Sequence, residues 1–183
     1  MKKYYFPFLF FLLIGNALVA QVELKLNGYG FFYDIPYVSV EFFLNKNVGL
    51  EVGAGLLNKA RGESIYDKKF MFFIVGKRYL FEHNENLYDN TYVGMYVSGQ
   101  VEYRIFKDMF PANYKEPSFV VGGMIGRKWM YTKKIFMEGN LGLGLKNSKK
   151  TFEPNIFVFI NDDEITRKWT TDIFLSFLVG YRF

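Results

Sequence analysis

The sequence predicts an all-β fold: a closed eight-stranded antiparallel up-and-down barrel that follows a cleaved signal peptide. Three observations support this prediction. Apolar residues recur with a period of two in eight successive segments after residue 20. The 183 residues include 22 Phe, 14 Tyr and 17 Gly but no Cys, a composition that favours strands over helices. The last of the eight segments runs to the final residue of the sequence, Phe183.

The first 20 residues have the pattern of a secretory signal peptide. A basic start and an apolar stretch over residues 4–14 precede small residues near position 20. The stretch is shorter than the roughly 20 residues that a spanning helix needs, and Pro7 interrupts it. We therefore predict a signal peptide at residues 1–20 and a single barrel domain at residues 21–183. Cleavage after Ala17 and an uncleaved anchor are the alternatives.

The first four segments lie in the N-terminal half of the predicted barrel. In the second, Val38, Val40 and Phe42 share one face, whereas Ser39 and Glu41 share the other. The fourth segment is apolar on both faces, so its alternation does not settle which residues point inward. The four segments occupy residues 21–32, 36–45, 48–57 and 68–80.

The other four segments show the alternation over longer stretches. In the fifth, Val93, Met95 and Val97 oppose Tyr96 and Ser98. Antiparallel strands of about 10 residues or more, eight in number, suit a closed barrel. These four segments occupy residues 91–104, 118–130, 135–146 and 173–183.

Alternation alone does not say which face is inside. A soluble lipocalin-like barrel turns its apolar face inward around a ligand, whereas a membrane barrel turns it outward to lipid. The less apolar face of this chain carries small and aromatic residues such as Gly53, Gly142 and Tyr96, with sparse charges. A solvated face would be dense in Lys, Glu and Thr, whereas this composition suits the filled lumen of a narrow barrel. The sequence therefore predicts a transmembrane β-barrel.

Three alternate segments end in a similar pattern of Gly, a basic residue and a final aromatic residue. They are "GKRY" at 76–79, "GRKW" at 126–129 and "GYRF" at 180–183. In each, Gly and a basic residue lie at positions expected to face the lumen, and the aromatic residue is the last one expected to face outward. Aromatic rings at one level form the girdle of a membrane interface. The girdle predicted in this way comprises Tyr79, Trp129, Tyr181 and Phe183.

A leader, eight amphipathic strands and a last strand ending in "VGYRF" resemble the small outer-membrane barrels of the OmpA and OmpX kind, within the porin-family barrels. The resemblance implies a monomer in the outer membrane of a Gram-negative type envelope, in contact with outer-membrane lipid. It also implies that Phe183, with Tyr181 and Val179, is the signal read by the barrel-assembly machinery. No peptidoglycan-binding domain follows the barrel in this sequence, so a cell-wall tether is not implied.

The resemblance places both ends of the barrel in the periplasm. Connections after odd-numbered strands are then external, and those after even-numbered strands are internal. External connections are expected at residues 58–67, 106–116 and 147–168, and tight internal turns at 45–47 and 130–134.

Several charged residues have the lumen parity. We considered two hypotheses for them: a polar pore or gate with switching salt bridges, and a static network that fills the barrel and fixes its register. Because eight strands leave room only for side chains, the static network is favoured. The predicted lumen charges are Glu41, Glu51, Glu102, Glu138, Arg78, Arg104, Lys128 and Arg182.

The sequence offers little for catalysis, cofactors or metals. His83 is the only His, it falls in a predicted internal turn, and the absence of Cys excludes thiolate sites. The acidic run "NDDE" at 161–164 lacks the spacing and Gly of a calcium loop. A formal net charge of +5 is too small to indicate nucleic-acid binding. We expect no enzyme activity, no cofactor, no metal and no nucleic-acid partner.

The external connection at 147–168 contains a predicted hairpin. An exposed strand edge there could pair with an extracellular partner, or the hairpin could simply extend the barrel strands. The favoured function is a non-enzymatic outer-membrane barrel with a structural, adhesion or partner-binding role. The alternatives are a narrow channel for small solutes and, further, a soluble periplasmic ligand-binding barrel or a lipid-modifying barrel enzyme. The hairpin residues are Ile156, Phe157, Val158, Phe159, Ile160, Asp162 and Asp163.

Overall fold

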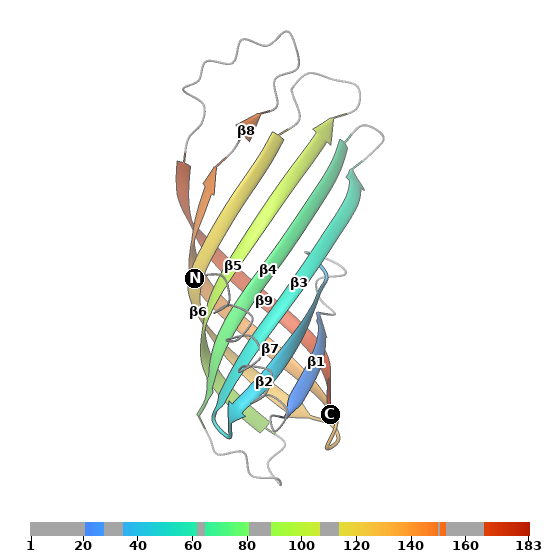
Figure 1. Cartoon of the computed structure of the whole chain (residues 1–183), viewed down its shortest axis with the longest axis vertical. Helices are drawn as coiled ribbons and strands as arrows, with labels where there is room; N and C mark the ends of the chain where they lie inside the picture. The colour runs from blue at the N-terminus through green and yellow to red at the C-terminus, as the bar shows by residue number, and fades with distance from the viewer. Residues whose placement is uncertain are drawn as a thin grey trace, which may run out of the picture.

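A computed structural model of the chain describes residues 21–27, 35–61, 65–80, 89–106, 114–149, 151–152 and 167–183. These residues form an all-β structure (Figure 1). None of them forms a helix that is long and apolar enough to cross a membrane. The strands are β1 (Val22–Asn27), β2 (Tyr37–Asn45), β3 (Val48–Arg61), β4 (Ile65–Tyr79), β5 (Asp89–Phe106), β6 (Tyr114–Met130), β7 (Ile135–Lys149), β8 (Thr151–Phe152) and β9 (Arg167–Arg182).

Eight of these strands form the wall of a closed barrel. Each pairs antiparallel with its neighbours in the chain, and the sheet closes because β9 pairs with β1, with Leu26 opposite Val179. The two-residue strand β8 lies beyond the end of β7 and pairs only with β6, with Lys115 opposite Thr151. The predicted closed eight-stranded antiparallel up-and-down barrel is therefore confirmed.

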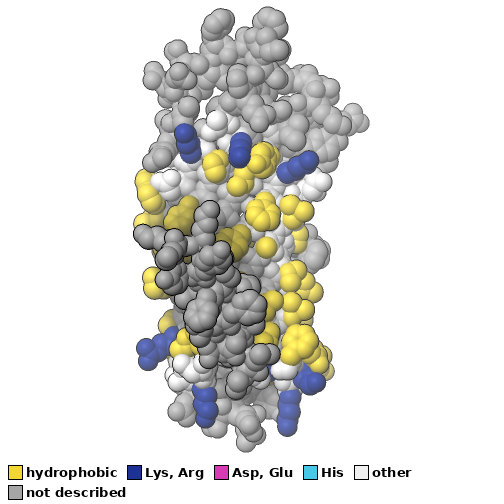
Figure 2. Space-filling model, in the orientation of Figure 1, with side chains coloured by type: hydrophobic (Ala, Val, Ile, Leu, Met, Phe, Trp, Pro, Cys, Tyr) yellow, Lys and Arg dark blue, Asp and Glu magenta, His cyan; other side chains and the backbone are white. Residues whose placement is uncertain are grey.

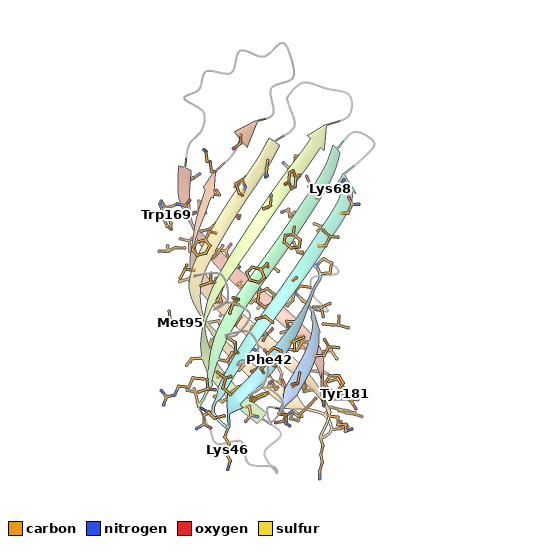
Figure 3. All side chains as sticks on the ribbon, viewed as in Figure 1. Phe42, Lys46, Lys68, Met95, Trp169 and Tyr181 are labelled. Carbon is orange, nitrogen blue, oxygen red and sulfur yellow. The ribbon has the colours of Figure 1, made fainter. Side chains whose placement is uncertain are left out.

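The apolar face of every wall strand points outward. Figure 2 shows hydrophobic side chains of this kind on one side of the barrel, and Figure 3 shows Met95 and Trp169 pointing away from it. Met95 and Ile173 are each 72% exposed and Leu143 is 62% exposed, values far above those of core side chains. A soluble ligand-binding barrel would bury these side chains instead. The lumen-facing set alternates with them and is mostly buried along β1, β7 and the lower part of β9.

Glycines of the inner face make room for aromatic rings in the lumen. Gly122 and Gly144 face each other on β6 and β7, and the ring of Tyr96 lies against both. A Cβ on Gly144 would come within 2.6 Å of the Tyr96 hydroxyl and 2.9 Å of the Val121 carbonyl oxygen. The glycine-rich face in the sequence is therefore the part of the wall that accommodates large lumen side chains.

The fourth strand is shifted in phase by one residue relative to the prediction. Arg78 was predicted in the lumen and Tyr79 in the outer girdle, but Arg78 is exposed and Tyr79 is buried, with 4% of its surface accessible. Lys77, Val75 and Phe73 point inward with Tyr79. The repeated Gly-basic-aromatic phrase was misleading here because both faces of β4 are apolar. The inward setting brings the Lys77 ammonium group to buried carboxylates.

The turns at the end of the barrel that carries Phe183 fall where they were predicted. Residues 46–47 join β2 to β3, and residues 131–134 join β6 to β7. At the opposite end the strands are longer than predicted, because β3 runs to Arg61 and β4 starts at Ile65. The expected connection at 58–67 is thus largely strand, since Asn58 to Arg61 pair in register with Lys68 to Ile65.

We predict that Gly144→Ala destabilises the barrel by about 1–3 kcal/mol, because the added methyl group overpacks a site bounded by backbone and by the Tyr96 ring. Gly76→Ala is the matched control, since a Cβ at Gly76 meets no atom within 4 Å. Urea unfolding of the purified barrels in detergent measures both effects. Equal unfolding midpoints for the two variants would show that the lumen is not packed as described.

Candidate functional site

A cluster of buried charges crosses the lumen in the half of the barrel near Phe183. Its four carboxylates balance its four cations, and with the Tyr92 hydroxyl all eight wall strands contribute a side chain. The carboxylates belong to Glu23 (β1), Glu41 (β2), Glu51 (β3) and Glu138 (β7), and the cations to Lys25 (β1), Lys77 (β4), Lys128 (β6) and Arg182 (β9). All eight are at most 7% exposed. We call these eight residues the ion cluster.

Lys25 and Lys77 share the same three carboxylates. The Lys25 ammonium group lies 2.9 Å from Glu51 and 2.7 Å from Glu138, and it also contacts Glu41. The Lys77 ammonium group lies 2.5 Å from Glu51, 2.6 Å from Glu138 and 3.4 Å from Glu41. Each of these carboxylates therefore bridges cations from different strands.

Glu23 accepts the other two cations. The Lys128 ammonium group lies 2.5 Å from one Glu23 oxygen, and the Arg182 guanidinium donates two bonds of 2.9 and 2.7 Å to the other. Lys128 also lies 3.4 Å from Glu41 and 3.8 Å from Glu138, which links this pair to the rest of the cluster. The strand pairing of β1 with β9 sets Glu23 directly opposite Arg182.

Neutral donors complete the hydrogen bonding of the carboxylates. The Tyr79 hydroxyl donates to Glu41 over 2.5 Å, the Tyr92 hydroxyl to Glu138 over 2.6 Å, and the Ser39 hydroxyl to Glu51 over 2.5 Å. Aromatic rings also face the ammonium groups: Lys77 lies 4.4 Å from the ring centre of Tyr92, and Lys128 lies 4.9 Å from that of Phe136.

The buried charges are thus neutralised within the lumen rather than by solvent. An unpaired buried charge is strongly unfavourable, whereas a paired one whose remaining hydrogen bonds are satisfied can be tolerated. The fully buried rings of Tyr92 and Phe136 fill space beside the ion cluster. The described side chains therefore close this half of the lumen.

A cavity lies on the other side of the ion cluster. Its volume is about 90 Å³, and Glu51 and Lys77 belong to its lining. Its walls are mainly aromatic, aliphatic and methionine side chains, among them Phe73, Tyr96 and Phe174. The lumen is therefore an open cup above a plug, not a continuous pore, in the described part of the chain.

Glu102 and Arg104, which were predicted in the same network, form a separate group near the rim of the cup. The Arg104 guanidinium lies 2.7 Å from Asp67 and 3.4 Å from Glu102, and Lys69 lies 3.1 Å from Glu102. The Arg104–Asp67 and Lys69–Glu102 pairs join β4 to β5, because Asp67 is opposite Arg104 and Lys69 is opposite Glu102, whereas Arg104 and Glu102 both lie on β5.

The structure brings together five of the predicted lumen charges: Glu41, Glu51, Glu138, Lys128 and Arg182. Sequence reasoning omitted three members of the ion cluster. Glu23 and Lys25 carried a usable signal, since they alternate with outward apolar residues on β1. Lys77 was missed because the phase of β4 was set one residue out.

The predicted girdle residues other than Tyr79 point outward. Trp129 is 41% exposed, Tyr181 39% and Phe183 72%. The hairpin residues 156–160, 162 and 163, the acidic run 161–164, His83 and the signal peptide 1–20 lie outside the described residues.

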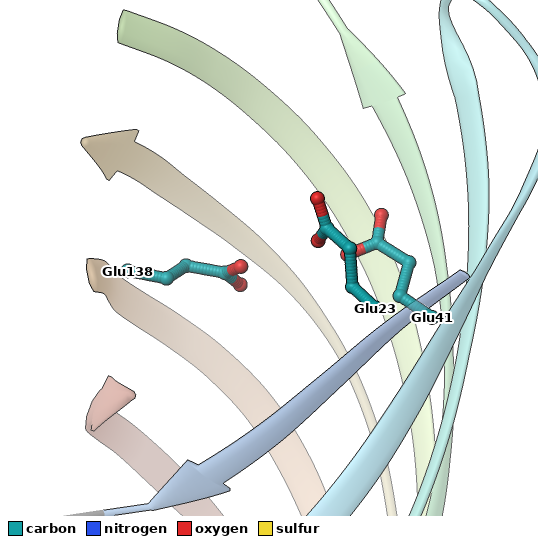
Figure 4. A group of neighbouring side chains, drawn as sticks. All are labelled: Glu23, Glu41 and Glu138. Carbon is teal, nitrogen blue, oxygen red and sulfur yellow. The ribbon is translucent and has the colours of Figure 1, made fainter. Parts of the chain in front are cut away.

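Three members of the ion cluster, Glu23, Glu41 and Glu138, place carboxylate oxygens within 4.8 Å of one another (Figure 4). Oxygen ligands of this kind suit hard cations such as Ca²⁺ and Mg²⁺. In this barrel the ammonium group of Lys128 lies within 3.8 Å of all three carboxylates. A metal ion would have to displace a cation that the chain itself supplies, so the geometry fits an ion-pair cluster and not a metal site.

Comparison with known proteins adds a family and a fold. A family model described as "Protein of unknown function (DUF3575)" matches residues 5–173. None of the curated proteins matches the sequence.

Two solved structures are similar to the chain. The N-terminal β-barrel domain of Pseudomonas aeruginosa OprF has a TM-score of 0.52 and 15% identity, with 89% of this chain and 97% of that chain covered. Neisserial surface protein A (NspA) has a TM-score of 0.48 and 13% identity, with 90% and 96% covered. The likeness to the OprF domain supports the predicted barrel fold.

We predict that Lys25→Met lowers the free energy of unfolding by about 3–5 kcal/mol, because it leaves buried carboxylates short of one cation. The double variant Lys25→Met/Glu51→Gln restores the charge balance and should recover part of this loss. Lys68→Met, an exposed position, is the control and should change stability little. Unfolding in urea, followed by tryptophan fluorescence, measures all three. If the double variant had a lower free energy of unfolding than Lys25→Met, by about as much as a second buried substitution costs on its own, charge balance would not be what stabilises the cluster.

Proposed function

We propose that this chain, which belongs to the family described as protein of unknown function (DUF3575), is an integral outer-membrane barrel whose lumen is closed by the ion cluster. In this proposal it is non-enzymatic, and it acts as a structural or partner-binding element through the external end of the barrel. The observation that carries the proposal is the combination of an outward apolar surface with a charge-balanced plug.

The height of the apolar band supports a bilayer as its surroundings. On β4 the outward residues Phe70, Phe72 and Ile74 are apolar and 50%, 47% and 40% exposed, and they lie between the exposed Lys68 and Arg78. Ten residues separate these two cations. At about 3.3 Å per residue and a tilt of about 40°, the band is about 25 Å tall. The apolar band of outer-membrane barrels has about this height.

Aromatic side chains lie at the lower edge of the band. Trp129, Tyr181 and Phe183 are outward and exposed near the turn at 131–134. Rings with one apolar and one polar side favour the boundary between acyl chains and water. Their position supports a membrane boundary at this end of the barrel, and the predicted periplasmic location of this end belongs to the proposal.

The plug supports a closed barrel in preference to a channel. Ions crossing this lumen would have to pass between side chains that hold one another at hydrogen-bond distance on all eight wall strands. Separating such buried pairs without a replacement partner is costly. A partner-binding role at the external end, including the predicted hairpin within 147–168, remains part of the proposal.

Two measurements test this proposal. We expect the protein to sediment with outer membranes and to migrate faster on gels when unheated than when boiled, because the closed barrel resists detergent. Recovery of the mature protein in plain buffer as a stable monomer without detergent would contradict the membrane assignment.

Conductance in planar bilayers distinguishes the closed barrel from the narrow channel. We expect no steady current from the purified protein at neutral pH, since the ion cluster blocks the path. A steady single-channel current carried by the native barrel would contradict a closed lumen and favour the channel.

A further inference from the structure

The exposed charges of the barrel are of one sign. Among the residues whose burial the structure describes, every exposed charged side chain is Lys or Arg, and none is Asp or Glu. The exposed cations are Lys46, Lys68, Arg78, Lys115, Arg127, Lys133, Lys134, Lys149 and Lys168. Because eight acidic residues have a described burial, this separation is not a consequence of a described wall poor in acids.

The acidic residues of the wall lie on the inner side or are partly covered. Every Asp and Glu whose burial the structure describes is buried or half-buried, and most of them take part in the ion cluster or the rim pairs. These residues are Glu23, Glu41, Glu51, Asp67, Glu102, Glu116, Glu138 and Asp172. The outer surface of the described wall therefore presents Lys and Arg without exposed Asp or Glu side chains beside them, which favours a positive potential there.

The exposed cations form two belts, one at each end of the apolar band, as Figures 2 and 3 show. The upper belt, near the connections after β3, β5 and β8, comprises Lys68, Lys115, Lys149 and Lys168. The lower belt, near Phe183, comprises Lys46, Arg78, Arg127, Lys133 and Lys134. Each belt draws on at least three elements of the wall, so neither is a single local patch.

Aromatic rings fix the depth of some belt cations. The Lys115 ammonium group lies 5.3 Å from the ring centre of Tyr103 in the upper belt. In the lower belt the Lys134 ammonium group lies 5.7 Å from the ring centre of Tyr181. Such rings favour the membrane–water boundary, so the cations beside them are held at headgroup depth.

We propose that both belts bind anionic, phosphate-bearing lipid headgroups, one belt in each leaflet. This inference rests on the proposed membrane location and adds a lipid preference to it. Positive residues next to a membrane attract anionic lipid through the surface charge, with a range set by ionic strength. An acidic protein partner fits less well, because the cations follow both edges of the apolar band rather than gathering on one side.

The lipid preference can be measured on the native protein. The barrel is placed in phosphatidylcholine bilayers with trace amounts of spin-labelled phosphatidylglycerol or spin-labelled phosphatidylcholine, and electron paramagnetic resonance gives the fraction of each lipid held at the protein surface. We expect the labelled phosphatidylglycerol to associate about 2-fold more strongly at low salt. In 1 M NaCl the preference should fall towards one, since the screening length is then about 3 Å.

Variants assign the preference to the belts. K68Q/K115Q/K149Q in the upper belt and K46Q/R78Q/K134Q in the lower belt should each reduce it, and the six substitutions together should reduce it further, to the contribution of the three belt cations that remain. The matched control N58Q/T151Q/T171Q changes exposed neutral positions and should keep it. Equal association of the two lipids with the native protein would overturn the inference, as would a preference that all six substitutions leave unchanged.

The two proposals can fail separately. Flotation with the lipid vesicles reports whether the barrel is incorporated at all. A protein that stays in the soluble fraction contradicts the membrane location, whereas a protein that floats without lipid preference contradicts only the anionic belts.

Discussion

The constraint on which the structure depends is the narrow interior of an eight-stranded barrel. Such a barrel has room for side chains but not for a layer of water around each buried charge. Every charge that points inward must therefore find its counter-charge on another strand. The ion cluster meets this requirement with four carboxylates and four cations. Because its contacts join strands far apart in sequence, such as Glu23 with Lys128 and Arg182, the same pairs also fix the register.

The narrow interior also accounts for the glycines of the inner face and for the separation of buried carboxylates from exposed cations. Large rings fit inside only where the facing wall has no side chain, as Tyr96 does against Gly122 and Gly144. Carboxylates placed inside are stabilised by the inward cations, and the charged side chains whose exposure on the outer face is described are Lys and Arg. The result is a neutral plug within a positively charged outer surface. The proposed closed outer-membrane barrel and its proposed preference for anionic lipid are both argued from this arrangement.

The sequence was sufficient to predict which side chains point into the lumen wherever one face of a strand is clearly more polar than the other. The alternation of Glu23 and Lys25 with Leu24 and Leu26 on β1 predicts their directions, as it does for Glu138 on β7. It was not sufficient for β4, where Phe72 and Phe73 are both aromatic and only the partners of Lys77 across the lumen decide the phase.

Sequence reasoning also placed all lumen charges in one network. The separation of Glu102 and Arg104 from the ion cluster depends on their height in the barrel, which follows from the pairing register. Period-two alternation excludes a register slip of one residue but not of two, so it does not give the height of a side chain in the barrel. The likeness to the OprF domain supports the barrel fold but does not bear on these individual pairs.

The exchange of the buried ammonium protons tests the central claim most directly. In protein labelled with ¹⁵N-lysine, nuclear magnetic resonance detects an ammonium group only when its protons exchange slowly with water. A closed, fully paired ion cluster predicts slowly exchanging ammonium signals from Lys25, Lys77 and Lys128, each lost in the corresponding Lys→Met variant. If the ammonium protons of these three lysines exchanged as fast as those of the exposed Lys46, the lumen would be wet and the account of a closed, charge-balanced barrel would be contradicted.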